Sequence, residues 1–189
     1  MVSQKFNGGW SFWFRWLIAT VIGWVVGLIL AIVLSYAVVS LFFDETTNLI
    51  VGLALGAGVG LAQMIAVRKI LPLTWRWVWG AAAGIGLPFV IAVVIDEMWF
   101  SEAETFEAGF VIVGAVGGAL AGLIQQGALR SHTSLAKWWI LASPVSWGLA
   151  WLANIVLGEA GIAVGGIVLG AVSGAMLIRM VDEKPSISG

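Results

Sequence analysis

Long apolar runs separated by short polar stretches dominate the chain. A helix needs about 20 mostly apolar residues to cross the hydrocarbon core of a bilayer, and six runs approach or exceed that length. They cover residues 16–43, 49–67, 77–95, 108–129, 138–157 and 160–178. The first run is longer than the roughly 7–15 apolar residues of a signal peptide, so it is also predicted to span the membrane. The pattern predicts an all-α polytopic membrane protein with six transmembrane helices in a single domain, residues 1–189.

Charged residues are sorted between alternate connections of this pattern. The 9 basic residues are Lys5, Arg15, Arg68, Lys69, Arg76, Arg130, Lys137, Arg179 and Lys184. All of them lie towards the chain ends or close to the connections after the second and fourth predicted helices, whereas the other connections carry carboxylates only. Because basic loops remain on the cytoplasmic side, we expect a multi-pass protein of the cell membrane with cytoplasmic N- and C-termini.

Glycine recurs at every fourth position in each even-numbered predicted helix. The positions are Gly52, Gly56, Gly60, Gly114, Gly118, Gly122, Gly166, Gly170 and Gly174. Glycine costs a helix about 1 kcal/mol relative to alanine, but in a bilayer it lets helix backbones approach closely. We therefore assign these glycines to helix packing. Gly56→Leu is expected to destabilise the fold, and Gly58→Leu, on another face, is expected to be mild unless that face is also packed.

A basic residue followed by tryptophan lies at the start of each odd-numbered predicted helix. The pairs are Arg15 and Trp16, Arg76 and Trp77, and Lys137 and Trp138. Such residues are typical of the membrane–water interface, and we assign all six as interface anchors. With the glycines they divide the chain into three two-helix repeats, 10–71, 74–131 and 136–181. Repeats of parallel topology are related by an axis along the membrane normal, which predicts pseudo-threefold symmetry.

Composition removes most catalytic chemistries. Only 10% of the residues are charged, against about 25% in soluble domains, and the chain has no cysteine and one histidine, His132. Charges avoid the middle of the predicted spans, which argues against proton-coupled transport and voltage sensing. Ser173 lies in the glycine-rich stretch "GAVSG", but a serine nucleophile needs an oriented base. We predict no catalytic residue, no metal site, no cofactor, no enzymatic activity and no nucleic-acid partner.

Neutral polar side chains in the predicted spans are the remaining candidates for a binding site. Gln63 and Gln125 occupy equivalent positions in two repeats. They are interpreted either as interhelical hydrogen-bond partners or as part of a polar ring that binds a ligand. Asn154 and Tyr36 complete the set of ligand-binding candidates.

The order of motifs from the second to the fifth helix is a glycine stripe, Gln, Arg, a short loop and then Trp-Trp. This pattern, with Gln125, Arg130, Trp138 and Trp139 in one copy, resembles a group of uncharacterised bacterial multi-pass membrane proteins with helical hairpin repeats. The resemblance implies a bacterial source and carries no assigned activity.

Two functions remain open at the level of the sequence. The first is a non-catalytic accessory or scaffold subunit, whose partners are the lipid bilayer and another membrane protein subunit. The second is a small-solute binding or transport protein, similar to the six-helix substrate-binding component of a vitamin importer. A cavity among the polar side chains would favour the second function, whereas a solid core with an exposed apolar or aromatic flank would favour the first.

Overall fold

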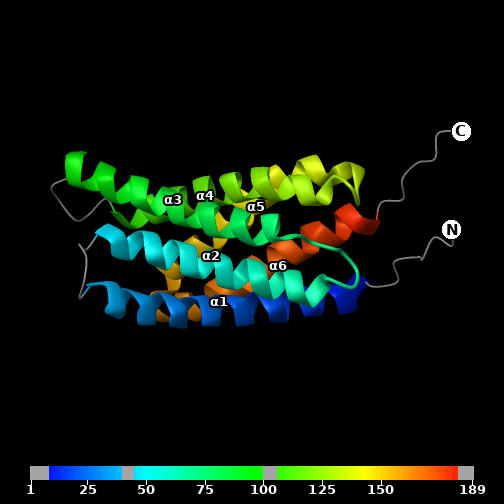
Figure 1. The fold of residues 1–189 in the computed structure, drawn as a ribbon, viewed down its shortest axis with the longest axis horizontal. Helices are drawn as coiled ribbons and strands as arrows, with labels where there is room; N and C mark the ends of the chain where they lie inside the picture. The colour runs from blue at the N-terminus through cyan, green and yellow to red at the C-terminus, as the bar shows by residue number, and fades with distance from the viewer. Residues whose placement is uncertain (1–8, 40–44, 100–105, 183–189) are drawn as a thin grey trace, which may run out of the picture.

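The computed structural model of the chain describes residues 9–39, 45–99 and 106–182 (Figure 1). Every regular element among them is helical. The α-helices are α1 (Gly9–Val39), α2 (Glu45–Val67), α3 (Trp75–Trp99), α4 (Phe106–Leu129), α5 (Trp139–Leu157) and α6 (Glu159–Asp182). A short 3₁₀ helix, η2 (Ser134–Trp138), precedes α5. The predicted all-α class with six long helices is confirmed.

Among the described residues, α1, α2, α4, α5 and α6 each contain a segment that is long and apolar enough to cross a membrane. A helix satisfies its own backbone hydrogen bonds, which is why apolar spans of this kind fold as helices in lipid. By length and composition, these helices therefore fit the expected membrane protein. A membrane-spanning role for α3 stays a prediction.

Local residues explain two of the connections. Thr133 caps η2, because its Oγ1 accepts a hydrogen bond from the backbone N–H of Leu135 at 3.1 Å. Gly158 alone links α5 to α6, with a φ of 55°. This left-handed conformation is accessible to glycine without strain, so the chain can reverse its direction within one residue.

The six helices form a closed ring. Each helix packs against the helices before and after it in the chain, and α6 packs against α1 to complete the circle. Among the described residues, helices that are not neighbours in this ring have no Cα atoms within 8 Å of each other. Side chains therefore have to fill the centre.

Both described ends of the chain lie at one end of the ring. Figure 1 shows the start of α1, the end of α6, and the connections α2–α3 and α4–α5 at this end. The exposed side chains of Arg15, Arg76 and Arg130 are at the same end. We refer to it below as the basic end.

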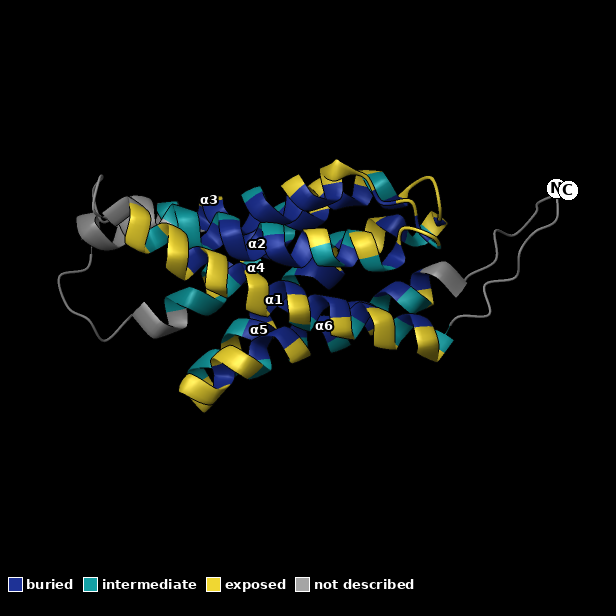
Figure 2. Cartoon of the chain, turned by 60° about the horizontal axis from the view of Figure 1, so that its bottom comes forward, coloured by how far each residue is buried: buried dark blue, intermediate teal, exposed yellow. Residues whose placement is uncertain are grey.

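The outward faces of the helices are apolar. Figure 2 shows exposed positions along the outer sides of α1 and α5 and buried positions towards the interior. On α1, the exposed residues include Ile18, Ile22, Val25, Ile29 and Ile32. In water an exposed apolar surface of this kind would promote association between proteins, whereas the acyl chains of lipids are equally apolar and can cover it.

The glycines of α2 allow close contact with helices on two sides. A Cβ added to Gly56 would collide with the carbonyl oxygen of Ala81 in α3, and it would lie 2.8 Å from the Cα of Ala82. A Cβ on Gly58 would lie 2.5 Å from the carbonyl oxygen of Gly23 in α1. The face that carries Gly58 is therefore packed as well, and the structure gives no reason to expect Gly58→Leu to be mild.

The glycines of α4 and α6 have different neighbours. In α4, a Cβ on Gly118 would lie 2.7 Å from the Cα of Pro144 in α5, so backbone again faces backbone. In α6, a Cβ on Gly166 would lie 2.8 Å from the ring of Trp24. The indole of Trp16 takes the same role beside Gly174, at 2.9 Å. Tryptophan side chains of α1 thus fill the contact between α1 and α6.

Candidate functional site

Three tryptophans meet in the interior of the ring near its basic end. Trp16, Trp77 and Trp139 come from α1, α3 and α5, and all three side chains are buried. Their ring centroids are 5.8 Å apart for Trp16 and Trp77, 6.4 Å for Trp16 and Trp139, and 5.3 Å for Trp77 and Trp139. Both pairs that include Trp16 are edge-to-face, the geometry that aromatic quadrupoles favour.

The two glutamines predicted to be equivalent each accept a hydrogen bond from one of these indoles. Trp77 Nε1 donates to Gln63 Oε1 at 3.1 Å, and Trp139 Nε1 donates to Gln125 Oε1 at 2.9 Å. The other end of each amide also has a partner. Gln125 Nε2 donates to the backbone carbonyl of Trp77 at 3.1 Å, and Gln63 Nε2 donates to Thr20 Oγ1 at 3.0 Å.

The hydrogen bonds continue through α1 into α6. Thr20 Oγ1 donates to the carbonyl of Trp16 at 2.8 Å, and Trp16 Nε1 donates to Ser173 Oγ at 2.9 Å. Ser173 Oγ donates in turn to the carbonyl of Leu169 at 2.5 Å. One continuous series of hydrogen bonds therefore joins residues of all six helices. Because unpaired polar groups are costly in a low-dielectric interior, this series favours a single arrangement of the ring.

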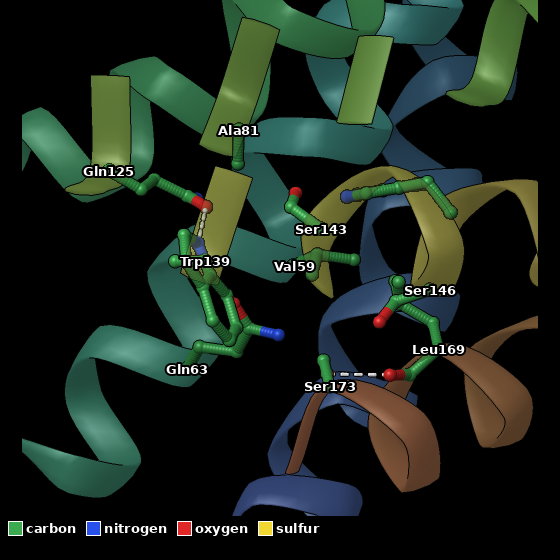
Figure 3. A pocket seen from close by; sticks show the side chains of 10 residues that line it. Val59, Gln63, Ala81, Gln125, Trp139, Ser143, Ser146, Leu169 and Ser173 are labelled. Atoms are coloured by element: carbon green, nitrogen blue, oxygen red, sulfur yellow. Dashed lines mark hydrogen bonds between the residues drawn. The ribbon is translucent and has the colours of Figure 1, made fainter. Parts of the chain in front are cut away.

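A small cavity lies beside this network. Gln63, Gln125, Trp139 and Ser173 contribute to its lining, together with Ser143, Ser146, Val59, Ala81, Trp147 and Leu169 (Figure 3). Its volume is about 10 Å³. A space of about 10–15 Å³ is what one water molecule needs, so the cavity is too small for a metabolite.

The structure places two of the assigned interface anchors in the interior. Trp16 and Trp77 are buried in the tryptophan cluster and do not face the lipid interface. Trp138 is half exposed, and its neighbour Trp139 takes the central position. The physical reason is that glutamine or serine acceptors inside the ring satisfy the indole N–H groups, so burial leaves no donor unpaired.

The remaining anchors are exposed. The side chains of Arg15, Arg76 and Lys137 lie on the surface near the basic end. Tryptophans with exposed rings are also found there, and they include Trp10, Trp75, Trp79 and Trp138. An aromatic belt requires exposed rings, and the buried Trp16 and Trp77 do not meet that requirement.

Asn154 and Tyr36 are not part of the central cluster. The side chain of Tyr36 is 80% exposed and lines an outer groove between α1 and α2. Asn154 is partly buried in α5, and its Oδ1 has no hydrogen-bond partner among the residues that the structure describes. Of the ligand-binding candidates, the structure brings together only Gln63 and Gln125.

Sequence reasoning missed Trp139 and Thr20 as partners of the glutamines, and Ser173 as the acceptor for the indole of Trp16. One signal for Trp139 was present in the sequence. Trp77 follows Gln63, and Trp139 follows Gln125, at the same separation of 14 residues. Thr20 and Ser173 have no such signal. Thr20 meets Gln63 where α1 packs against α2, and Ser173 meets Trp16 only when α6 closes the ring against α1.

The geometry offers little for catalysis. The hydroxyl of Ser173 is engaged by Trp16 and Leu169, while the exposed His132 lies with its Nδ1 2.8 Å from Ser131 Oγ. No group of three or more metal-ligating side chains occurs within the described ranges. The central cluster therefore holds helices together, and its polar groups are occupied by one another.

No protein-family model, no curated protein sequence and no solved structure matches the chain.

Proposed function

We propose that the chain is a non-catalytic accessory or scaffold subunit in the cell membrane, with six spans and cytoplasmic termini. The observation that carries the proposal is the solid centre of the ring. Gln63 and Gln125 are satisfied by tryptophans and Thr20, and the cavity beside them has a volume of about 10 Å³. A transport protein needs a solute-sized site or path, and the packed centre supports the structural role instead.

The hydrogen bonds support the proposed pseudo-threefold arrangement of repeats. In each case an indole of an odd-numbered helix donates to a side chain of the preceding even-numbered helix, if α6 is taken to precede α1 around the ring. The three pairs are Trp77 with Gln63, Trp139 with Gln125, and Trp16 with Ser173. The third repeat has Leu177 where the others have glutamine, and Ser173, one helical turn earlier, supplies the acceptor.

Membrane topology is testable in a background that already lacks cysteine. Single cysteines are introduced by Glu102→Cys, between α3 and α4, and by His132→Cys, between α4 and η2. The distribution of basic residues predicts opposite sides for these positions. A membrane-impermeant maleimide should label the first variant in intact cells and the second only after lysis. Labelling of both from one side would contradict the six-span topology.

The flank of α3 is the surface that we assign to a partner subunit. Trp75 and Trp79 are separated by one helical turn and therefore share a face, and both rings are exposed. Both indoles therefore lie on the surface of the described part of the chain. Large aromatic side chains are over-represented among the residues that dominate binding energy at protein interfaces.

The accessory role predicts a defined complex. Wild-type protein purified in mild detergent should carry a second polypeptide at a fixed ratio in native mass spectrometry. The double variant Trp75→Ala/Trp79→Ala should lose this polypeptide, whereas the control Trp10→Ala/Trp138→Ala, which removes exposed tryptophans elsewhere, should retain it. A wild-type chain that carries a small solute and no second polypeptide would overturn the proposal in favour of solute binding.

A further inference from the structure

Two apolar grooves flank α6 near the basic end of the ring. The first lies between α1 and α6, has a volume of about 480 Å³, and is lined by Gly9, Trp10, Trp13, Ala171, Ala175, Ile178 and Arg179. The second lies between α5 and α6 and has a volume of about 330 Å³. Its lining includes Trp138, Leu141, Val145, Met176 and, again, Arg179.

Arg179 is the only charged residue that lines either groove within the described part of the chain. Its side chain is exposed and comes from the last turn of α6, so its guanidinium has a position at the end of the helix where lipid headgroups lie. A guanidinium binds a phosphate through paired, charge-assisted hydrogen bonds. Basic pockets between helices on the cytoplasmic side of a membrane bind anionic lipid headgroups in this way.

We propose that α6 is the binding site of one anionic diacyl phospholipid of the cytoplasmic leaflet. The phosphate binds Arg179, and one acyl chain lies in each groove, so that the lipid straddles the helix. Trp10 and Trp138, one from each groove, present exposed indoles at the level that headgroups occupy. The assignment of the leaflet rests on the proposed orientation of the chain, whereas the binding chemistry does not.

A third groove provides an internal comparison. It lies between α1 and α2, has a volume of about 440 Å³, and is lined by Leu28, Ala31, Ile32, Ser35, Tyr36 and Val51. Its described lining contains no basic side chain. A phospholipid with an acyl chain in this groove would therefore show no preference for an anionic headgroup. The grooves are similar in volume, so Arg179, and not groove size, distinguishes the site at α6.

Native mass spectrometry in detergent tests the site with palmitoyl-oleoyl phosphatidylglycerol and phosphatidylcholine as probes. A basic residue near a membrane surface contributes about 1 kcal/mol to the binding of anionic lipid, so wild-type protein should bind phosphatidylglycerol about fivefold more tightly. Arg179→Gln should abolish the preference. Arg76→Gln, which removes an exposed arginine from α3 at the same end, should preserve it.

A second variant tests the grooves independently of the charge. Ala175 is exposed and lines the groove between α1 and α6, so Ala175→Trp should fill that groove and weaken the binding of both lipids. Equal affinity of wild-type protein for the two lipids would overturn the proposal. Equal losses in Arg179→Gln and Arg76→Gln, or a second copy of the chain bound in place of lipid, would also overturn it. Because the assay needs no partner subunit, its failure is distinct from failure of the accessory role.

Discussion

Trp77→Ala is expected to lower the free energy of unfolding by about 3–5 kcal/mol, the range for removal of a large buried aromatic side chain. The ring of Trp77 is 0% exposed and contacts both Trp16 and Trp139. Its removal would leave a cavity between α1, α3 and α5. It would also leave Gln63 Oε1 without the donor that it has at 3.1 Å, and an unsatisfied buried acceptor adds to the loss.

Trp79→Ala is the matched control, because the same substitution is made two residues later in the same helix. Trp79 is 67% exposed, so its removal should change the free energy of unfolding by less than about 0.5 kcal/mol, as at other surface positions. The measurement is unfolding of the detergent-solubilised protein by titration with sodium dodecyl sulfate, followed by circular dichroism. Similar losses for both variants would mean that the tryptophan cluster does not hold the ring together.

Gly56→Ala is expected to destabilise the fold by about 1–3 kcal/mol, the usual cost of overpacking. The added methyl group meets the backbone of Ala81 and Ala82 in α3, and backbone atoms of a packed helix cannot move aside as the end of a flexible side chain can. The two helices must separate, which weakens the dispersion contacts that hold them in a bilayer. Gly56→Leu should cost more.

The control for this prediction is Gly127→Ala in the last turns of α4. Among the described residues, no atom beyond its own stretch of helix lies within 4 Å of the position where its Cβ would be. Alanine is the better helix former by about 1 kcal/mol, so this change should leave stability unchanged or raise it slightly. The two variants are compared in one thermal melt in detergent. Loss of stability in Gly127→Ala equal to that in Gly56→Ala would show that the spacing of glycines has no special role.

The helices were predictable because an apolar run of sufficient length has few alternatives to a helix in lipid. Their ends were less predictable. Helix α2 begins at Glu45 and α3 continues to Trp99, and both extend beyond the apolar runs because polar residues also continue a helix into water. The five residues of η2 were missed because they continue directly into the apolar run of α5.

The central cluster was predictable only in part. The spacing of glycines predicted that Gln63 and Gln125 are equivalent, and both residues line the interior cavity. The burial of Trp16 and Trp77 was not visible, since a tryptophan beside a basic residue has the same sequence signature at a lipid interface and at the end of a packed helix. What decides between them is an acceptor on a neighbouring helix, and Ser173 is separated from Trp16 by 157 residues.

The closure of the ring through α1 and α6 has a consequence for how the chain order relates to the fold. Each helix packs its backbone only against its two neighbours, and α1 and α6 are neighbours too, so the same ring allows the chain to be opened at other connections. A circular permutant that begins at α3, with α6 joined to α1 at the basic end and the chain opened between α2 and α3, would keep every helix pair in contact. Chains whose ends are close together tolerate such rearrangement. A permutant that folds would show that the cyclic order of the helices, and not their order along the chain, specifies the fold.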